Sequence, residues 1–364
     1  MACYKNGNNN IRVVAVAVVS GENGSNWTWF LELVKGRLNF EPSYIISDRD
    51  KGLQLACHTV YPTVHHFYCF RHVMENFNRK FGNKALKVVA WRLVKAPTQF
   101  ESMEQQEKLK SMSEPALNWL MNIGFDKITL VYSPVCRYGM VTSNNVESIN
   151  SRFKDYRRLP ILEFLLSIEK TILVDMVDDR TMVASWSTSL TGYAAKVYAE
   201  NIRKSSVAAT IIRTGVREYI VLVAGKQFQV SIGPHRFRCS CGSFCLVRFP
   251  CMHYTAVLLQ LQDETMEGHH CPTWSKDLFS SACLPFDVEY PLTILDDLIK
   301  SETYAPSITK TRGRPKKNRF ESQGSTVELE RQIRTSTRGP YKCKKCNERG
   351  HNARTCTVNL PPGS

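Results

Sequence analysis

The chain has 364 residues, 43% of them hydrophobic and 22% charged, which is ordinary for a globular protein and excludes a wholly disordered chain or a fibrous repeat. Its longest apolar run, residues 13–19, is far shorter than the roughly 20 residues of a membrane-spanning helix, so we expect no membrane partner. The net charge of +15 favours a polyanion as binding partner. The sequence lacks the pattern of a signal peptide, so we expect an intracellular protein whose 13 cysteines are mostly reduced and available to bind metal.

The first 50 residues predict a strand, a helix and a second strand. Residues 11–19 are β-branched and apolar, and the turn-rich run 6–10 before them is typical of a hairpin connection. Ser25 or Asn26 is expected to cap a helix that runs through Val34. Residues 43–47 then predict a short buried strand that ends at Asp48. An acid at the carboxyl end of such a strand lies where α/β proteins place their chemistry.

The middle of the chain predicts a helical insertion in the sheet. Apolar residues recur at helical spacing from residue 52 to about residue 130, with breaks at two prolines. Two further helices are expected, one over 144–153 with Ser143 as its cap and one from Pro160 to about Val177. Residues 218–223 and 227–232 predict a β-hairpin with a turn at residues 225–226.

A cluster of cysteines follows this hairpin directly. The pattern Cys239-x-Cys241-x9-Cys251-x-His253 supplies three thiolates and one imidazole, the ligand set of a closed tetrahedral structural zinc site. Cys245 lies inside the loop and could replace a ligand, but the outer four form two symmetric close pairs and are preferred. The hairpin, CSCG, FPCMH and an apolar helix together resemble the SWIM zinc finger, a module for interaction with nucleic acid or protein.

A second cysteine cluster closes the chain. Its spacing resembles the retroviral-type CCHC zinc knuckle, and only a tight turn can bring its ligands onto one ion within so few residues. Knuckles of this type hold single-stranded nucleic acid. With the first cluster, this set predicts two structural zinc ions per chain; its ligands are Cys343, Cys346, His351 and Cys356.

The charge is concentrated near the end of the sequence. Residues 305–364 hold 14 Lys and Arg against four Glu and no Asp, a net charge of +10, which favours nucleic acid as partner. Within them a short basic stretch resembles the core of an AT-hook, which lies extended in a narrow A·T minor groove. It is equally typical of a nuclear import signal, and both functions are compatible with a nuclear protein. The stretch comprises Arg312, Gly313, Arg314, Pro315, Lys316 and Lys317.

Five segments in chain order resemble the core of Mutator-like (MULE) transposases and the related far-red-impaired-response transcription factors of plants. They are WTWFLELV, YIISDRDKGL, HHFYCFRHVMENF, TSNNVESINSRF and LPILEFL, within roughly residues 5–180. The resemblance implies an RNase H-like fold with a DDE triad of acids that binds two magnesium or manganese ions. Asp48 then matches the second acid and Glu147 the third. Cys69 and His72 match the family's CxxH pair. Two roles are equally compatible with this pair: they bind a metal ion, or they are a buried thiol and a packed histidine on a helix.

The first acid of the triad has no counterpart in the sequence, because no aspartate precedes Asp48. The resemblance places that acid on a strand upstream of Met1 and aligns residues 2–11 with the turn after the family's second strand. We therefore expect an N-terminally truncated domain, from an incomplete gene model or a decayed copy. The leading hypothesis is a transposase-derived, zinc-binding, nucleic-acid-binding protein without intact catalysis. The alternatives are an active transposase with a longer native chain and a far-red-type transcription regulator.

These expectations define an α/β protein with four parts. Residues 1–180 form the incomplete RNase H-like domain with its helical insertion, and residues 181–265 hold the hairpin and the SWIM finger. A linker with the basic stretch, residues 266–338, leads to the CCHC knuckle at residues 339–358. A homo-oligomer is compatible with this organisation, which the sequence does not otherwise specify.

Overall fold

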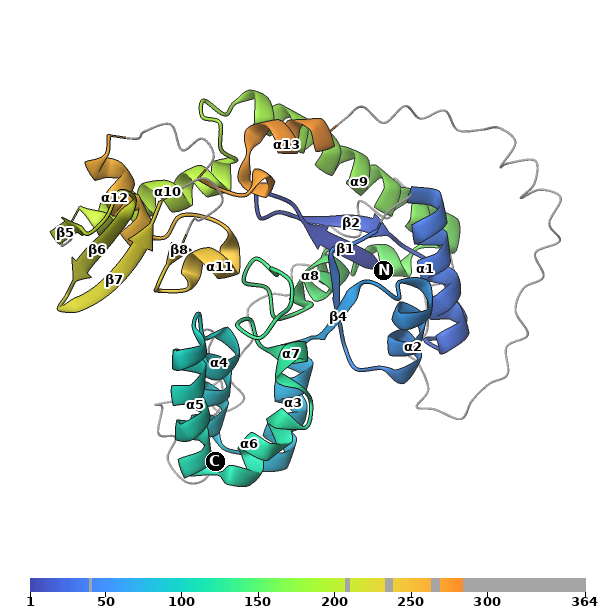
Figure 1. The fold of residues 1–364 in the computed structure, drawn as a ribbon. Helices are drawn as coiled ribbons and strands as arrows, with labels where there is room; N and C mark the ends of the chain where they lie inside the picture. Colours follow the sequence, from blue (N-terminus) through green and yellow to red (C-terminus); the bar gives the residue numbers. More distant parts are fainter. Residues whose placement is uncertain (39–40, 207–209, 233–237, 263–268, 284–364) are drawn as a thin grey trace, which may run out of the picture. The chain divides into compact units, whose positions relative to one another are not determined.

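The computed structural model describes residues 1–38, 41–206, 210–232, 238–262 and 269–283. The chain divides into two units, Met1–Pro306 and Ser307–Ser364, and all the described residues belong to the first. These residues form a mixture of helices and strands, as expected for the α/β class (Figure 1). None of the helices they form is long and apolar enough to cross a membrane.

The N-terminus forms an antiparallel hairpin of β1 (Ala2–Lys5) and β2 (Ile11–Ala15). The side chain of Asn6 closes the turn, because its Oδ1 accepts from the backbone N–H groups of Asn8 and Asn10. The predicted hairpin connection is therefore confirmed. The strand predicted over residues 11–19 is too long, since β1 offers a partner only as far as the Ala2–Ala15 pair. Residues 2–11 were expected to be a turn, but Ala2–Lys5 form strand β1 because they pair with β2.

Two strands and two helices follow the hairpin: α1 (Gly24–Leu38), β3 (Tyr44–Ser47), α2 (Lys51–Val60) and β4 (His65–Tyr68). Helix α1 begins before the predicted caps because Asn23 Oδ1 accepts from Asn26 N at 2.9 Å. Strand β3 confirms the prediction, but β4 lies inside the region predicted to be helical. Four residues are too short for a period to show, and β4 is stabilised by parallel pairing with β3 instead. Helices α1 and α2 pack on each other through the core around Phe30 and Cys57.

The helical insertion is confirmed beyond β4. Its core is built around Phe70, Phe77 and Leu109, and capping residues separate its helices. Gly82 ends the first helix in the left-handed region, at φ 60°, and Thr98 accepts from Glu101 N just after the break at Pro97. The helices are α3 (Phe70–Phe81), α4 (Lys84–Lys95), α5 (Gln99–Met112), α6 (Glu114–Met121) and α7 (Phe125–Ile128).

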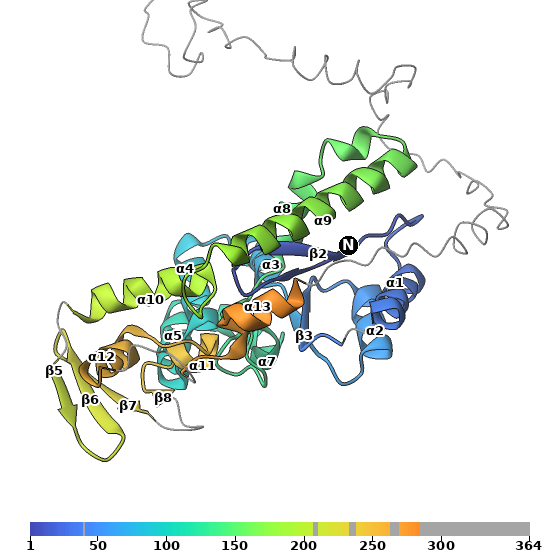
Figure 2. The same cartoon turned by 90° about the horizontal axis from the view of Figure 1, so that it is seen from above.

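Helices α8 (Asn144–Arg152) and α9 (Ile161–Ala184) lie beside the N-terminal hairpin, as Figure 2 shows. Ile149, Phe153 and Ile168 bury their side chains against apolar residues that include Ile11 and Val13 of β2. Both helices were predicted, but α9 continues past Val177. Within the described ranges, β1–β2 and β3–β4 are two separate two-stranded sheets, so a single RNase H-like sheet stays a prediction.

The hairpin is also joined to α9 by buried charges. Arg12 binds Asp179 with two hydrogen bonds, Nε to Oδ2 at 2.8 Å and Nη2 to Oδ1 at 2.6 Å. Asp175, one helical turn earlier, accepts two hydrogen bonds from Arg152 of α8. Both aspartates are about 5–6% exposed, so each depends on its guanidinium for compensation of a buried charge.

Replacing Arg12 with methionine is expected to lower the free energy of unfolding by about 3 kcal/mol, because the Asp179 carboxylate stays buried without its cation. The midpoint of urea unfolding measures the loss. Arg203→Met is the matched control: Arg203 pairs with Glu200 on an exposed face of the helix over 192–205, so its loss should leave the midpoint almost unchanged. Equal effects of the two substitutions would contradict this assignment.

The last described region is a four-stranded antiparallel sheet with helices against it. The strands run in the order β5 (Thr210–Arg213), β6 (Glu218–Val223), β7 (Lys226–Ser231) and β8 (Arg238–Cys239). The predicted hairpin of β6 and β7 is confirmed, and β5 and β8 extend it on either side. Val221, Val230 and Leu258 lie in its core. The helices of this region are α10 (Gly192–Ser205), α11 (Ser243–Val247), α12 (Met252–Gln260) and α13 (Lys276–Ala282).

Candidate metal centre and acidic site

The acidic site begins where the parallel strands β3 and β4 end. Ser47 and Tyr68 are register partners at the last position of the two strands, so the residues after them emerge at one edge. Asp48 follows β3 directly, and Cys69 follows β4 and precedes α3, which carries His72. The backbone N–H of Cys69 donates to Ser47 O at 2.6 Å and joins the two strand ends.

A second set of contacts brings the segment before α8 to the same edge. Phe70 N donates to Val141 O at 2.8 Å, and Ser143 N donates to the sulfur of Cys69 at 3.2 Å. Cys69 is 1% exposed, so its thiol is a buried acceptor at the start of α8. Segments 48, 69–72 and 141–147, which are far apart in the sequence, therefore meet at one place.

Glu147 lies in the first turn of α8 and points to α3. Its carboxylate contacts His72 Nε2 at 3.6 Å and forms an ion pair with Arg71 Nη1. Arg71 also donates to Asn144 Oδ1. The sequence analysis did not select Arg71, although it lies between the two residues of the CxxH pair. The resemblance implies that the Glu147 carboxylate binds a catalytic metal ion. In this structure the carboxylate is paired with the guanidinium of Arg71 instead.

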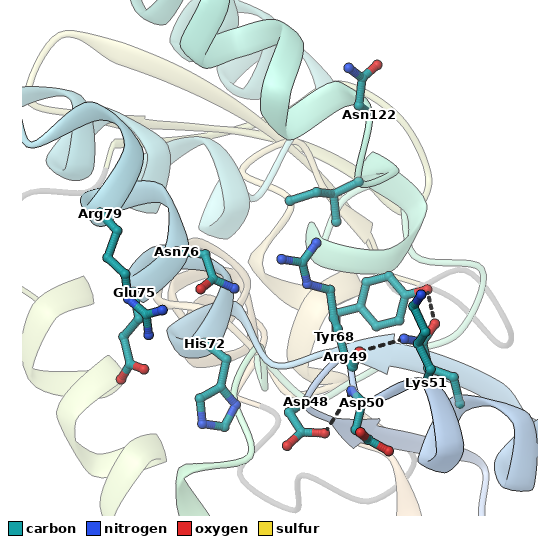
Figure 3. A pocket seen from close by; sticks show the side chains of 12 residues that line it. Asp48, Arg49, Asp50, Lys51, Tyr68, His72, Glu75, Asn76, Arg79 and Asn122 are labelled. Atoms are coloured by element: carbon teal, nitrogen blue, oxygen red, sulfur yellow. Dashed lines mark hydrogen bonds between the residues drawn. The ribbon is translucent and has the colours of Figure 1, made fainter. Parts of the chain in front are cut away.

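Asp48 borders a cavity of about 620 Å³ whose lining mixes both charges (Figure 3). His72 shares this lining, whereas Glu147 is not part of it. The Asp48 side chain is exposed and accepts from Asp50 N at 3.2 Å. Acidic and basic side chains alternate around the cavity: Asp48, Arg49, Asp50, Lys51, Glu75 and Arg79.

His66 of β4 lies next to this site. Burial lowers the pKa of His66 to about 4, with a smaller contribution from the nearby charge of Lys127. The imidazole is therefore neutral at pH 7, and its Nε2 lies 2.7 Å from Ser47 Oγ. This contact fixes the residue that immediately precedes Asp48.

The cysteine cluster is formed by the end of β8 and the start of α12. Cys239 is the last residue of β8, opposite Val230 of β7. The chain then turns at Gly242, which has a φ of 73° and lies so close to Pro97 that a Cβ would be 2.1 Å from Pro97 O. The turn therefore leaves no room for a side chain. Cys251 caps α12, and His253 lies in the first turn of that helix.

The four ligand atoms of Cys239, Cys241, Cys251 and His253 all lie within 4.8 Å of one another. His253 Nδ1 is 3.6 Å from the sulfur of Cys239 and 3.9 Å from that of Cys251. Among the described residues this is the one group of three or more Cys, His, Asp or Glu side chains gathered so closely. Cys245 is exposed and lies outside the group, in agreement with the preference for the outer four.

The surroundings of the cluster suit a metal ion. Cys239 and His253 are buried, and the ring of His253 stacks on Phe228 at 3.7 Å between centroids. Hydrogen bonds from the thiols of Cys239 and Cys251 lower the pKa of Cys241, which favours the thiolate form of this residue. Three soft sulfur donors and one imidazole fit a tetrahedral zinc ion. The cluster can thus hold a metal ion, and its donors are compatible with zinc.

The remaining predicted ligands lie outside the described residues. They are the knuckle residues Cys343, Cys346, His351 and Cys356 and the basic stretch 312–317. The second zinc ion and the AT-hook therefore stay predictions.

Comparison with known protein families gives one match. The family model of the MULE transposase domain matches residues 1–76. That segment contains Asp48, Cys69 and His72, and it runs from β1 into α3. The match supports the resemblance to MULE transposases for this part of the chain. No curated protein matches the chain.

Proposed function

We propose that the chain is a transposase-derived protein that binds zinc and DNA and, as the 364-residue chain, does not cleave DNA. The match of residues 1–76 to the MULE transposase domain carries this proposal. The cluster of three cysteines and a histidine supports its zinc-binding part. The net charge of +10 in residues 305–364 supports its DNA-binding part.

The proposed role of the zinc is structural. Cys239 and Cys241 come from the end of the sheet, whereas Cys251 and His253 come from the start of α12. An ion held by all four ligands would join the sheet to its covering helix, as closed four-ligand sites do. This arrangement is the one expected of a SWIM-type finger, and we assign the finger to contact with nucleic acid. A CCHC knuckle with the second zinc ion would extend that contact.

The absence of cleavage is proposed from the acidic site. Magnesium or manganese would be held by Asp48 and Glu147, and two-metal phosphoryl transfer needs a further carboxylate to bridge the ions. Asp48 and Glu147 do not form a close group with a third acid among the described residues. The ion pair of Glu147 with Arg71 would have to break before its carboxylate could bind a cation.

A second candidate function is an active DDE transposase. It is supported by two observations: Asp48 and His72 line one cavity, and Glu147, the third acid that the resemblance implies, contacts His72. A longer native chain that supplies the first acid would restore the rest. A far-red-type transcription regulator is the non-enzymatic alternative, and reporter activation without strand transfer would favour it. We assign the protein to the nucleus in each case, on the basic stretch.

Replacing Arg314 with glutamine is expected to weaken binding to A·T-rich duplexes about tenfold and binding to G·C-rich duplexes much less, because a minor-groove arginine gains most in the narrow A·T groove. Fluorescence anisotropy with both duplexes at one fixed salt concentration measures the difference. Arg331→Gln is the control, since it removes the same charge outside the stretch. Equal losses of affinity for both duplexes would contradict the assignment of this stretch as an AT-hook. Failure of the unchanged chain to bind either duplex would contradict the proposed function.

A further inference from the structure

Helix α4 of the helical insertion carries positive charge and no negative charge. Its 12 residues include three lysines and one arginine, with no Asp or Glu. It is the one α-helix among the described residues that has more than one Lys or Arg and no acidic residue. The four cations, which we call the α4 basic face, are Lys84, Lys87, Arg92 and Lys95.

The apolar residues of α4 determine which side of the helix bears these cations. They belong to the buried core of the helical insertion, and they are Leu86, Val89, Ala90, Leu93 and Val94. The four cations are all exposed. Their spacings of three, five and three residues keep them on one side of the helix, opposite the buried side. The core therefore holds the α4 basic face toward solvent.

The α4 basic face is not neutralised by the protein itself. No Asp or Glu of the described residues forms an ion pair with any of the four cations. A helix that only faces water can carry mixed charges, as the neighbouring α5 does with three glutamates and two lysines. The single sign of charge on α4 therefore points to a partner of opposite charge.

Two of the four cations lie where the helix itself disfavours them. Lys84 and Lys87 are in the first turn of α4, which follows the N-cap Asn83. The helix dipole makes this end of the helix positive, so it repels cations. Helix stability thus opposes the presence of these lysines and does not explain it, whereas an anionic partner would compensate their charge.

The aromatic residue on this side of α4 favours duplex over single-stranded nucleic acid. The ring of Trp91 packs edge-to-face with Phe70, with centroids 4.8 Å apart, and Lys95 Nζ lies 5.1 Å from the centre of the Trp91 ring. Proteins that hold single strands stack bases on free aromatic rings. Because Trp91 is already engaged by Phe70 and Lys95, this side of α4 offers charge and no stacking platform.

We propose that the α4 basic face binds the phosphate backbone of duplex DNA. Residues 84–95 span about 16 Å at roughly 1.5 Å per residue, and duplex DNA carries one charge per about 1.7 Å of its axis, so several phosphates lie within reach. The helix contains no Asn, Gln, Ser or Thr, so the contact is made to phosphate and has little sequence preference. The proposal rests on the proposed DNA binding and adds to it a contact in the folded part of the chain, separate from residues 305–364.

Acetylation of lysines by an N-hydroxysuccinimide ester tests the α4 basic face in the unchanged full-length chain. The rate at each lysine is measured by peptide mass spectrometry, with and without an excess of a short duplex of mixed sequence. We expect the duplex to slow acetylation of Lys84, Lys87 and Lys95 about threefold or more, because bound phosphates cover them. Lys108 and Lys110, which are exposed on α5, should change little.

A fourfold variant tests the same surface by affinity. Lys84→Gln, Lys87→Gln, Arg92→Gln and Lys95→Gln are combined, and glutamine preserves the helix because its helix propensity is close to that of lysine and arginine. The slope of log K against log salt for duplex DNA should fall by about 2–4, since each neutralised phosphate contributes about 0.9. The matched control removes four other exposed charges and should keep the slope of the unchanged chain. Its substitutions to glutamine are at Lys108, Lys110, Lys154 and Lys170.

The outcomes separate this proposal from the proposed function. Protection of Lys316 and Lys317 by the duplex without protection of the α4 lysines would overturn the proposal and leave the proposed DNA binding intact. Equal slopes of the two fourfold variants would also overturn it. A chain that binds no duplex at all would contradict the proposed function as well. Single-stranded DNA of the same length should protect the α4 lysines less than the duplex, and stronger protection by the single strand would overturn the assignment to duplex DNA.

Discussion

Replacing Cys251 with serine is expected to reduce the zinc content of the purified chain from two ions to one. Cys251 joins α12 to the other ligands, and its sulfur lies in a group whose members are all within 4.8 Å. A serine hydroxyl is a much weaker zinc ligand than a thiolate, and structural zinc contributes roughly 10–16 kcal/mol of apparent binding free energy in small zinc modules. Loss of the ion should therefore loosen β8 and α12. Elemental analysis after dialysis and hydrogen exchange of the α12 amides measure both effects.

Two matched variants complete this experiment. Cys245→Ser should retain both ions, because Cys245 is exposed and lies outside the ligand group. Cys346→Ser should also lose one ion, but hydrogen exchange in α12 should stay unchanged because that site has no ligand in common with the first. A Cys251→Ser chain that keeps both ions would show that Cys251 is not a ligand.

Removing residues 305–364 is expected to flatten the dependence of DNA binding on salt. This segment carries +10 of the net charge of +15. Each phosphate that is neutralised contributes about 0.9 to the slope of log K against log salt, so a segment that contacts five phosphates contributes about 4.5. Binding isotherms over a series of salt concentrations give the slope for the whole and the shortened chain.

Cys346→Ser serves as the control for this deletion, because it disrupts the predicted knuckle without a change in the number of lysines and arginines. Its slope should stay near that of the unchanged chain. Equal affinity of the whole and the shortened chain for duplex DNA at moderate salt would show that the basic segment is not the main DNA contact.

The features that the sequence predicted well are those with a local physical signal. Metal ligands such as Cys239 and His253 follow a spacing that chemistry imposes, and the hairpin of β6 and β7 has two alternating runs around a turn. Helices α3 and α4 have clear apolar periods, and helices α3 to α6 have side-chain or glycine caps. In each of these cases the determinants lie within a few residues of the element itself.

Features that depend on distant partners were missed. Strand β4 has four residues and exists through its pairing with β3, and β2 ends where β1 no longer provides a partner. The ion pair of Glu147 with Arg71 joins positions 76 residues apart. No local sequence pattern around either residue indicates that the two form a pair. The burial of Arg137 was also missed, because an isolated arginine in a sequence is normally exposed.

The most direct test of the central claim is incubation of the purified 364-residue chain with a terminal-inverted-repeat duplex and either magnesium or manganese. We predict that the duplex is bound and stays uncut, because Asp48 and Glu147 do not form a close group with a third acid among the described residues that could bridge two ions. Asp48→Ala is the matched variant and should bind the duplex as the unchanged chain does. Cleavage by the unchanged chain that Asp48→Ala abolishes would contradict the claim and show that another residue, such as Glu22, completes the acidic site.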